Sequence, residues 1–189
     1  MKTIGVLALQ GDYNKHAQML EKLGVRAIEV RTSSQLLLID ALVIPGGEST
    51  TILKLIDKFG LRTELISFAK SHPVMGTCAG LIVLSSQVSN LEQKPLAILD
   101  VSVERNAYGR QRESFVDTVQ LSLNGKVNEI NGVFIRAPRI NRLGKGVQVL
   151  ATHKQEPVLV AANNILAATF HPELTDEDNI HRYFIEKFG

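Results

Sequence analysis

The sequence of 189 residues lacks features that mark several large classes of protein. It has a single cysteine, so no internal disulfide can form, which is typical of proteins from a reducing cytoplasm. Its net charge is only +2, which argues against a nucleic-acid-binding protein. Aromatic residues make up 5% of the chain, so few side chains are available to stack a flavin. No internal repeat, low-complexity tract or linker rich in proline or serine divides the chain.

Long apolar segments are also missing. The first ten residues carry one basic side chain and an apolar run too short to span a membrane. They predict a buried first strand rather than a signal peptide. We therefore expect a cytoplasmic protein without a membrane partner. The length suits one domain with a substantial core, so we expect residues 1–189 to form a single domain.

The order of apolar segments in the first half predicts an α/β fold. Continuous apolar runs at 3–9, 25–30 and 41–44 are typical of strands covered on both faces, and the spacing from Tyr13 to Leu23 predicts a helix between two of them. Strands that alternate with crossover helices form a parallel sheet. We therefore expect a three-layer α/β/α fold with a mostly parallel central sheet.

From Leu96 onwards the pattern changes to short strands joined by turns. We expect strands at 98–104, 115–123, 133–136, 147–152, 158–162 and 165–170. Asn124-Gly125 and Asn163-Asn164 are typical of hairpin turns. These strands should form an antiparallel extension of the parallel sheet, and the chain should end in a helix over about 176–188.

The single cysteine, Cys78, lies in Gly76-Thr77-Cys78-Ala79-Gly80, between a run typical of a strand and a run typical of a helix. This pattern predicts a nucleophile elbow, a sharp turn with a reactive side chain at its tip. A helix that begins at Ala79 directs the positive end of its dipole at the sulfur, which favours the thiolate. A lone cysteine is otherwise most often a buried apolar residue, so the hypothesis of a nucleophile requires a base.

His171 is the best candidate for that base. Pro172 disfavours the helical conformation for His171, and in extended chain residues i and i+2 point to the same side. Glu173 should therefore reach one imidazole nitrogen. A carboxylate that holds a histidine beside a cysteine is the arrangement of an activated thiolate. The set lacks the ligand spacing of a zinc site, so we expect no metal.

The other histidines fit this role less well. His72 begins the strand that ends at Cys78, which places it about 20 Å away at roughly 3.3 Å per residue. His16 and His181 fall in amphipathic helices, where we expect them on exposed faces. His153 follows a strand and has no obvious partner.

A glycine-rich loop, Pro45-Gly46-Gly47-Glu48-Ser49-Thr50-Thr51, joins a strand to a helix. In open α/β sheets ligands bind at this edge, where Cys78 is also expected. Two adjacent glycines allow backbone N–H groups to face an anion, although an ordinary turn explains Gly-Gly equally well. No Gly-Lys-Ser/Thr follows, so the loop is not a Walker A motif.

The elbow and the His171-Pro172-Glu173 segment together resemble the class I, or triad, glutamine amidotransferases, which have a flavodoxin-like fold. Further segments resemble one branch of them, the glutaminase subunits of pyridoxal 5′-phosphate synthase. These segments are Pro45-Gly46-Gly47-Glu48-Ser49-Thr50, Val103-Glu104-Arg105-Asn106, Phe115 and Phe134-Ile135-Arg136-Ala137-Pro138. One departure is Ala8, where the family pattern has glycine.

The resemblance implies a function. The chain would hydrolyse L-glutamine to glutamate and ammonia without a cofactor, using a catalytic triad of Cys78, His171 and Glu173. It would pass the ammonia to a barrel-shaped synthase subunit in a large hetero-oligomer. That partner makes pyridoxal 5′-phosphate (vitamin B6) from ribose 5-phosphate and glyceraldehyde 3-phosphate.

The resemblance also assigns roles to other residues. The oxyanion hole would use backbone N–H groups of Gly47 and Ala79. Gln10 and Gly46 would lie at an edge gated by the synthase subunit, and the basic loop 105–112 is a candidate contact surface. The residues expected to bind glutamine are Gly47, Glu48, Ser49, Arg105, Ile135 and Arg136.

Three other interpretations stay open at this point. A class I glutaminase could feed a different acceptor, although the Phe134-Ile135-Arg136-Ala137-Pro138 segment argues against this. A non-catalytic protein of the same architecture could use Cys78 as a redox sensor, with no need for His171 or Glu173. A flavodoxin-like nucleotide binder is disfavoured because no phosphate-loop motif is present.

Overall fold

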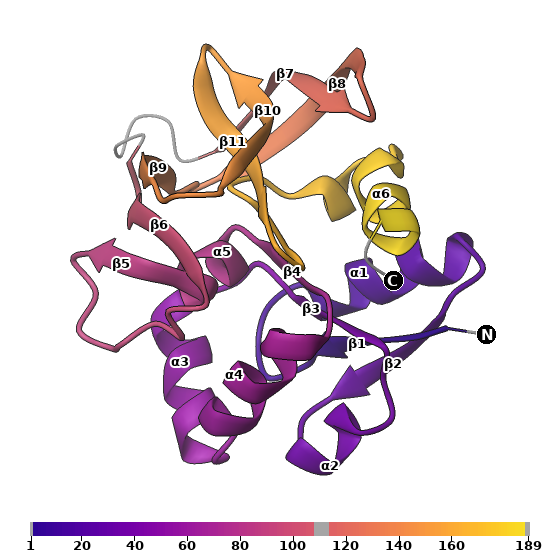
Figure 1. Cartoon of the computed structure of the whole chain (residues 1–189), viewed down its shortest axis with the longest axis vertical. Helices are drawn as coiled ribbons and strands as arrows, with labels where there is room; N and C mark the ends of the chain where they lie inside the picture. The colour runs from indigo at the N-terminus through magenta and orange to yellow at the C-terminus, as the bar shows by residue number, and fades with distance from the viewer. Residues whose placement is uncertain (1, 108–113, 188–189) are drawn as a thin grey trace.

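The structure is a computed structural model that describes residues 2–107 and 114–187, organised around a nine-stranded mixed sheet (Figure 1). The strands lie in the order β2-β1-β3-β4-β12-β11-β10-β7-β8. The parallel strands are β1 (Thr3–Leu7), β2 (Arg26–Val30), β3 (Ala41–Ile44), β4 (Val74–Thr77) and β12 (Ile165–Ala168). The antiparallel strands are β7 (Ser114–Leu123), β8 (Lys126–Ile135), β10 (Gln148–His153) and β11 (Glu156–Ala162). The predicted fold class, with its antiparallel extension, is confirmed.

Helices cover both faces of the sheet and complete three layers. One face carries α2 (Ser33–Leu36), α3 (Ser49–Lys58), α4 (Arg62–Ser71) and α5 (Ala79–Leu84), and the other carries α1 (Tyr13–Lys22) and α6 (Asn179–Lys187) (Figure 1). In β3, Leu42 and Ile44 pack toward the first set of helices, while Ala41 and Val43 pack toward the second. Burial on both sides explains why the parallel strands read as unbroken apolar runs. Within the described residues, no helix has the length and apolar content needed to cross a membrane.

One part of the second half differs from the prediction. A separate three-stranded sheet has the order β5-β6-β9, with β5 (Ser85–Ser89), β6 (Leu99–Glu104) and β9 (Arg139–Leu143). The strand expected at 98–104 is therefore present, but it does not extend the central sheet. An alternating pattern sets which face of a strand is buried and does not set its neighbour. Val101 and Val103 of β6 join the core beneath α3 and α5.

Glycines allow α5 to lie directly on the sheet. A Cβ on Gly80 would stand 2.0 Å from the carbonyl oxygen of Ile44 in β3. A Cβ on Gly76 would stand 2.7 Å from the carbonyl carbon of Gly80. Only hydrogen fits at these two positions, so the helix that follows Cys78 is held against β3 and β4. The turn that carries Cys78 is held with it.

Gly80→Ala should lower the free energy of unfolding by about 3 kcal/mol, because the new methyl group overlaps a strand carbonyl that has no room to move. A matched control is Gly24→Ala, at φ 77°, where a Cβ meets no described atom within 4 Å. That variant should lose only about 1 kcal/mol, from the left-handed backbone conformation. Urea unfolding of both variants measures the difference. Equal stability of the two variants would contradict the close packing of α5.

Candidate active site

Cys78 occupies the turn between β4 and α5, at the carboxyl edge of the parallel strands. Its φ of 48° and ψ of −102° lie where residues with a Cβ rarely occur, so the backbone is strained there. The Cys78 N–H donates to the carbonyl oxygen of Ala168 in β12 at 2.8 Å, which fastens the turn to the neighbouring strand. The Cys78 thiol donates to the carbonyl oxygen of Ile135 at 3.7 Å. The sharp turn predicted from the glycine pattern is present.

His171 lies just beyond the end of β12 and reaches the same edge of the sheet. Its backbone is extended, with φ −107° and ψ 86°, as Pro172 predicts. The His171 N–H donates to the carbonyl oxygen of Val133 in β8 at 2.9 Å. The imidazole packs on Gly46, where a Cβ would stand 2.3 Å from Cε1 of His171. The glycine-rich loop therefore provides the space that the imidazole occupies.

Glu173 contacts His171 as predicted, but the backbone that joins them has a different conformation from the one expected. The two side chains meet at 2.8 Å between Nδ1 of His171 and Oε1 of Glu173. The chain is not extended there, because Pro172–Leu174 forms the 3-10 turn η2. Proline is favoured in the first turn of a helix, and this preference prevailed over continued extension. The turn buries the Glu173 side chain completely, at 0% exposure.

The pKa shifts of His171 and Glu173 favour the charged form of each side chain. Burial alone would lower the pKa of His171, but hydrogen bonds to Cys78 and Glu173 and the charges of both groups raise it well above its ordinary value. Burial alone would raise the pKa of Glu173. The interactions with His16 and with His171 outweigh burial and hold that pKa below its usual range. These two shifts favour a protonated His171 beside an ionised Glu173.

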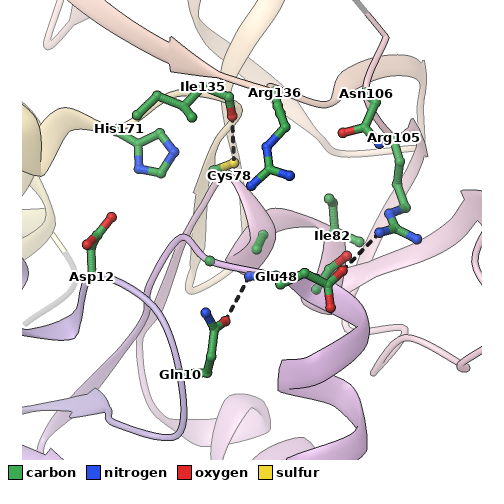
Figure 2. A pocket seen from close by; sticks show the side chains of 13 residues that line it. Gln10, Asp12, Glu48, Cys78, Ile82, Arg105, Asn106, Ile135, Arg136 and His171 are labelled. Atoms are coloured by element: carbon green, nitrogen blue, oxygen red, sulfur yellow. Dashed lines mark hydrogen bonds and ion pairs between the residues drawn. The ribbon is translucent and has the colours of Figure 1, made fainter. Parts of the chain in front are cut away.

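A pocket of about 230 Å³ opens in front of Cys78 and His171 (Figure 2). It collects residues from both halves of the chain. Its walls are Gln10, Asp12, Gly47, Glu48, Ser49, Cys78, Ala79, Ile82, Arg105, Asn106, Ile135, Arg136 and His171. Every residue predicted for glutamine binding or for the oxyanion hole lies in this lining. Gly46 and Glu173 lie behind His171 instead of facing the pocket.

The two predicted arginines differ in their surroundings. Arg105 is paired with Glu48, at 3.1 Å between Nη2 and Oε1, and it also donates to the carbonyl oxygen of Asn90. Glu48 in turn caps α3 by accepting from the N–H groups of Thr50 and Thr51. Arg136 has a φ of 43° and forms no ion pair with a described residue; it lines the same pocket as Cys78 (Figure 2).

Comparison with known proteins gives the family. The profile of the SNO glutamine amidotransferase family matches residues 6–189. The chain belongs to this family. The "Pyridoxal 5'-phosphate synthase subunit PdxT" of Thermotoga maritima is 48% identical over 184 residues, 97% of each chain. The protein of the same name from Koribacter versatilis is 52% identical over 183 residues, 97% of this chain and 94% of that one.

A solved structure supports the same assignment. A crystal structure of a glutamine amidotransferase is 46% identical, has a TM-score of 0.91 and covers 97% of each chain. The resemblance noted from the elbow, the glycine-rich loop and the His171-Pro172-Glu173 segment is therefore confirmed at the level of the family.

In this family member the glycine-rich loop interlocks with the turn after β1. The Glu48 N–H donates to Oε1 of Gln10 at 2.8 Å, and the Asp12 N–H donates to the carbonyl oxygen of Gly46 at 3.1 Å. Gly11 has a φ of 98°, and a Cβ there would overlap the Gly46 carbonyl. A movement of the turn at 10–12 would therefore shift the loop that carries Gly46 and Gly47.

Three histidines differ from the sequence-based expectation. His16 and His181 were expected on exposed faces, but both are 0% exposed. Nδ1 of His16 lies 2.9 Å from Nε2 of His181, and this hydrogen bond offsets part of the free-energy cost of burying the two polar rings. Each histidine falls on the apolar face of its helix, so the periodicity indicated burial, and the assumption that a polar side chain is exposed was wrong. His153 does have a partner, Asp117, at 2.9 Å.

Asp12, Ile82 and Asn106 line the pocket and were not predicted. Asp12 had a usable signal, since it follows β1 at the carboxyl edge of the sheet. Of the basic loop 105–112, residues 105–107 belong to the described chain and residues 108–112 lie outside it.

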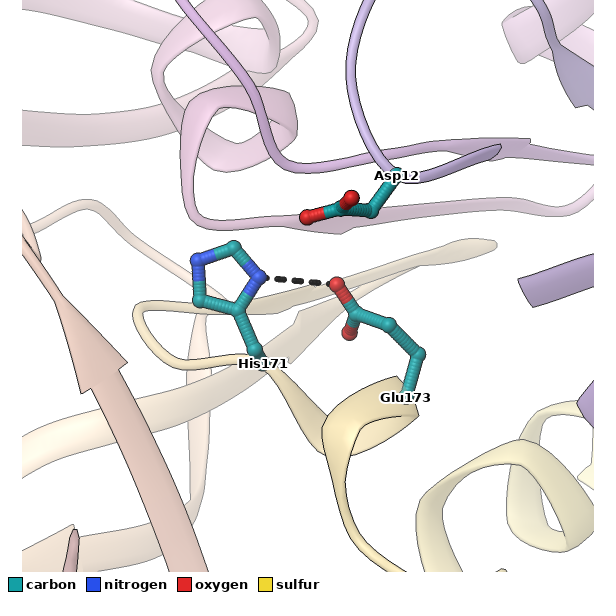
Figure 3. Close-up of side chains that lie close together, drawn as sticks. All are labelled: Asp12, His171 and Glu173. Carbon is teal, nitrogen blue, oxygen red and sulfur yellow. Dashed lines mark hydrogen bonds and ion pairs between the residues drawn. The ribbon is translucent and has the colours of Figure 1, made fainter. Parts of the chain in front are cut away.

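Asp12, His171 and Glu173 bring one ligand atom each within 4.8 Å of one another (Figure 3). Two carboxylates and an imidazole are ligand types that a divalent metal accepts. Nδ1 of His171 is already hydrogen-bonded to Glu173, so a metal between them would remove the contact that orients the imidazole. The absence of a metal stays a prediction from the sequence.

Proposed function

We propose that this chain hydrolyses L-glutamine with Cys78 as nucleophile and His171 as proton carrier, and that Glu173 positions His171. The single observation behind this proposal is that Cys78 and His171 line one pocket, with Glu173 hydrogen-bonded to the far nitrogen of His171. The chain supplies the ammonia that a pyridoxal 5′-phosphate synthase uses in making vitamin B6. Family membership and relatives that carry that enzyme's subunit name support this.

The reaction runs in two halves. The Cys78 thiolate attacks the side-chain amide carbon of glutamine, and His171 gives its proton to the leaving nitrogen, so ammonia departs and a thioester forms. His171 then takes a proton from water, whose oxygen attacks the thioester carbon. Glutamate leaves with the new carboxylate, and the thiolate–imidazolium pair is restored. Both tetrahedral intermediates carry an oxyanion, which we assign to the N–H groups of Gly47 and Ala79; one such donor contributes about 3 to 4 kcal/mol to lowering the barrier.

The polar end of glutamine needs its own contacts. We assign its α-carboxylate to Arg105 and Arg136, because a guanidinium can hold a carboxylate through two parallel hydrogen bonds. Glu48, Ser49 and Ile135 line the same part of the pocket. Glu48 keeps Arg105 at the pocket in the absence of substrate. The pocket therefore provides cations for the α-carboxylate and a thiol for the amide.

Arg105→Ala should raise the KM for glutamine by about tenfold to a hundredfold, because a hydrogen bond to a charged group is lost from the bound substrate. The kcat should change little, since the α-carboxylate is remote from the reacting amide. Steady-state glutaminase kinetics provide the measurement. Arg182→Ala is a matched control, because Arg182 is also paired with a carboxylate, Asp178, but lies outside the pocket. An unchanged KM in Arg105→Ala would reject the assignment.

The partner of the chain is a synthase subunit that accepts the ammonia. We propose that it is barrel-shaped, that it forms a large hetero-oligomer with this chain, and that it docks at the edge formed by Gln10 and Gly46. The hydrogen bond from the Glu48 N–H to Gln10 links that edge to the oxyanion loop. Docking that moves Gln10 would therefore reorient the peptide at Gly46-Gly47. We further place the complex in the cytoplasm.

The deciding experiment is glutamine hydrolysis by the purified chain, alone and with the synthase subunit of the same organism. Activity that appears only with the partner would support the chemistry and the gating together. Full activity of the chain alone would keep the chemistry and reject the gating. No hydrolysis in either case, by a chain that is folded, would reject the proposed function and favour a redox role for Cys78.

A further inference from the structure

A buried pair of imidazoles lies behind the carboxylate of Glu173. His16 comes from α1 and His181 from α6, and they are 165 positions apart in the chain. Their ring centroids are 5.1 Å apart at an interplanar angle of 47°. Both histidines are fully buried between these helices and the sheet. Two polar rings in an apolar layer destabilise a fold unless their hydrogen bonds are satisfied, so this pair requires an explanation.

His16 contacts both segments that carry the proposed reacting groups. Its Nε2 lies 3.4 Å from Oε2 of Glu173 and 3.1 Å from Oγ1 of Thr77. Thr77 directly precedes Cys78, and Glu173 holds His171 through its other oxygen. One imidazole nitrogen therefore faces the strand end that leads to Cys78 and the carboxylate that orients His171.

Oε2 of Glu173 depends on His16. Oε1 accepts from His171, whereas Oε2 is buried and, among the described residues, has no contact that meets strict hydrogen-bond geometry. The 3.4 Å ion-pair contact to His16 is what offsets its burial. Burial raises the pKa of Glu173, and the interaction with His16 is the largest of the effects that hold this pKa below its usual range. Without His16 the carboxylate would have an uncompensated oxygen in an apolar layer.

The position of the proton on His16 follows from its neighbours. An ionised carboxylate only accepts hydrogen bonds, so Nε2 of His16 must carry a proton to interact with Glu173. Burial and the neighbouring His16 lower the pKa of His181 to about 3, against the opposing charges of Glu173 and Asp178, so His181 is neutral. With its proton on Nε2, a neutral His16 has a bare Nδ1, so the 2.9 Å contact requires the Nε2–H of His181 to donate to Nδ1 of His16. Nδ1 of His181, which has no partner among the described residues, is then the bare nitrogen of that ring.

We propose that His16 is a positioning residue for glutamine hydrolysis: its Nε2–H is hydrogen-bonded to Oγ1 of Thr77 and holds Oε2 of Glu173 by a 3.4 Å electrostatic contact, and His181 fixes the tautomer of His16 that carries this proton. The role rests on the proposed function. Glu173 then has one oxygen held from behind and the other free to orient His171. Rotation of its carboxylate, which would release Nδ1 of His171, is opposed. His16 does not line the pocket that contains Cys78 and touches no reacting atom.

The test compares two substitutions of His16 in the complex with the synthase subunit. His16→Leu fills the space but removes the donor, and it should lower kcat about tenfold to a hundredfold with KM unchanged, the effect of a catalytic group displaced by about 1 Å. His16→Gln keeps an N–H near the position of Nε2 and should restore kcat to within a few-fold of the unsubstituted chain. A matched control is His153→Leu, a buried histidine paired with Asp117, which should leave kcat unchanged.

A double-substitution cycle separates positioning from general loss of packing. If His16 acts through Glu173, then adding His16→Leu to Glu173→Gln should lower kcat by less than about twofold further. If the fold-losses in kcat of the two single variants multiply in the double variant, the proposal is overturned. It is also overturned if His16→Gln lowers kcat as much as His16→Leu does.

Imidazole ¹⁵N NMR on the unsubstituted chain tests the proposal without any activity and covers the case in which His16→Leu does not fold. The expected result is a proton on Nε2 of His16 and a bare Nδ1. A bare Nε2 on His16 would overturn the inference whatever the kinetics. Failure of the unsubstituted complex to hydrolyse glutamine would overturn the proposed function and leave the NMR result to decide the tautomer.

Discussion

Replacing Cys78 with alanine should reduce glutamine hydrolysis by about four to six orders of magnitude, because the attacking atom is removed and no covalent thioester can form. The effect should fall on kcat, while the pocket that binds glutamine stays intact. Measurement requires the complex with the synthase subunit, assayed for glutamate release. Ammonium added to the assay should replace the ammonia that the variant no longer releases from glutamine. Formation of pyridoxal 5′-phosphate by the complex should therefore persist under those conditions.

The control for this variant is stability. Cys78 is almost fully buried and has a strained backbone, with a φ of 48°. Cys78→Ser preserves the volume and serves as the matched variant, and both should keep the thermal unfolding midpoint within a few degrees and still bind the partner. Turnover near that of the unsubstituted chain in either variant would show that Cys78 is not the nucleophile.

Glu173→Gln should lower kcat by about a hundredfold to ten-thousandfold, with a much smaller change in KM. The amide has nearly the same shape as the carboxylate but no charge. It can present an N–H to Nδ1 of His171, which would favour the wrong tautomer. A pure KM effect would instead assign Glu173 to substrate binding.

The same variant has a pH signature. The charge of Glu173 helps to raise the pKa of His171, so its removal should lower that pKa. The form with a protonated His171 is then lost at a lower pH as the pH rises. Because protonated His171 gives its proton to the leaving ammonia, the alkaline limb of kcat/KM for glutamine hydrolysis should move to lower pH in Glu173→Gln. An alkaline limb that does not move would contradict the coupling of the two groups.

Local chemistry in the sequence predicted much of the architecture and the likeness to a family. Unbroken apolar runs predicted the parallel strands, since both faces of those strands are buried. The Gly76 and Gly80 pattern predicted the sharp turn at Cys78, since only hydrogen fits where α5 meets β3. These features depend on a residue and its chain neighbours, and their physical causes are short-range.

The pairing of strands and the surroundings of buried polar groups were not predictable in that way. The alternation at 98–104 predicted a strand, but only the folded chain placed β6 with β5 and β9 instead of the central sheet. Pro172 predicted the extended conformation of His171 and not the 3-10 turn that carries Glu173. In both cases the sequence restricts the conformation of a residue or segment, while packing in the folded chain selects which segments it contacts.

The sequence by itself determined that a cysteine at a strained turn and a histidine followed by proline and glutamate lie in an α/β protein of the glutamine amidotransferase type. Only the tertiary structure decided that His16 and His181 lie behind Glu173. Helical periodicity records that a position faces the core, but a polar residue at such a position is stable only if a distant segment supplies its hydrogen-bond partner. That partner comes from contacts between α1, α6 and η2, which are remote in the chain and adjacent only after folding.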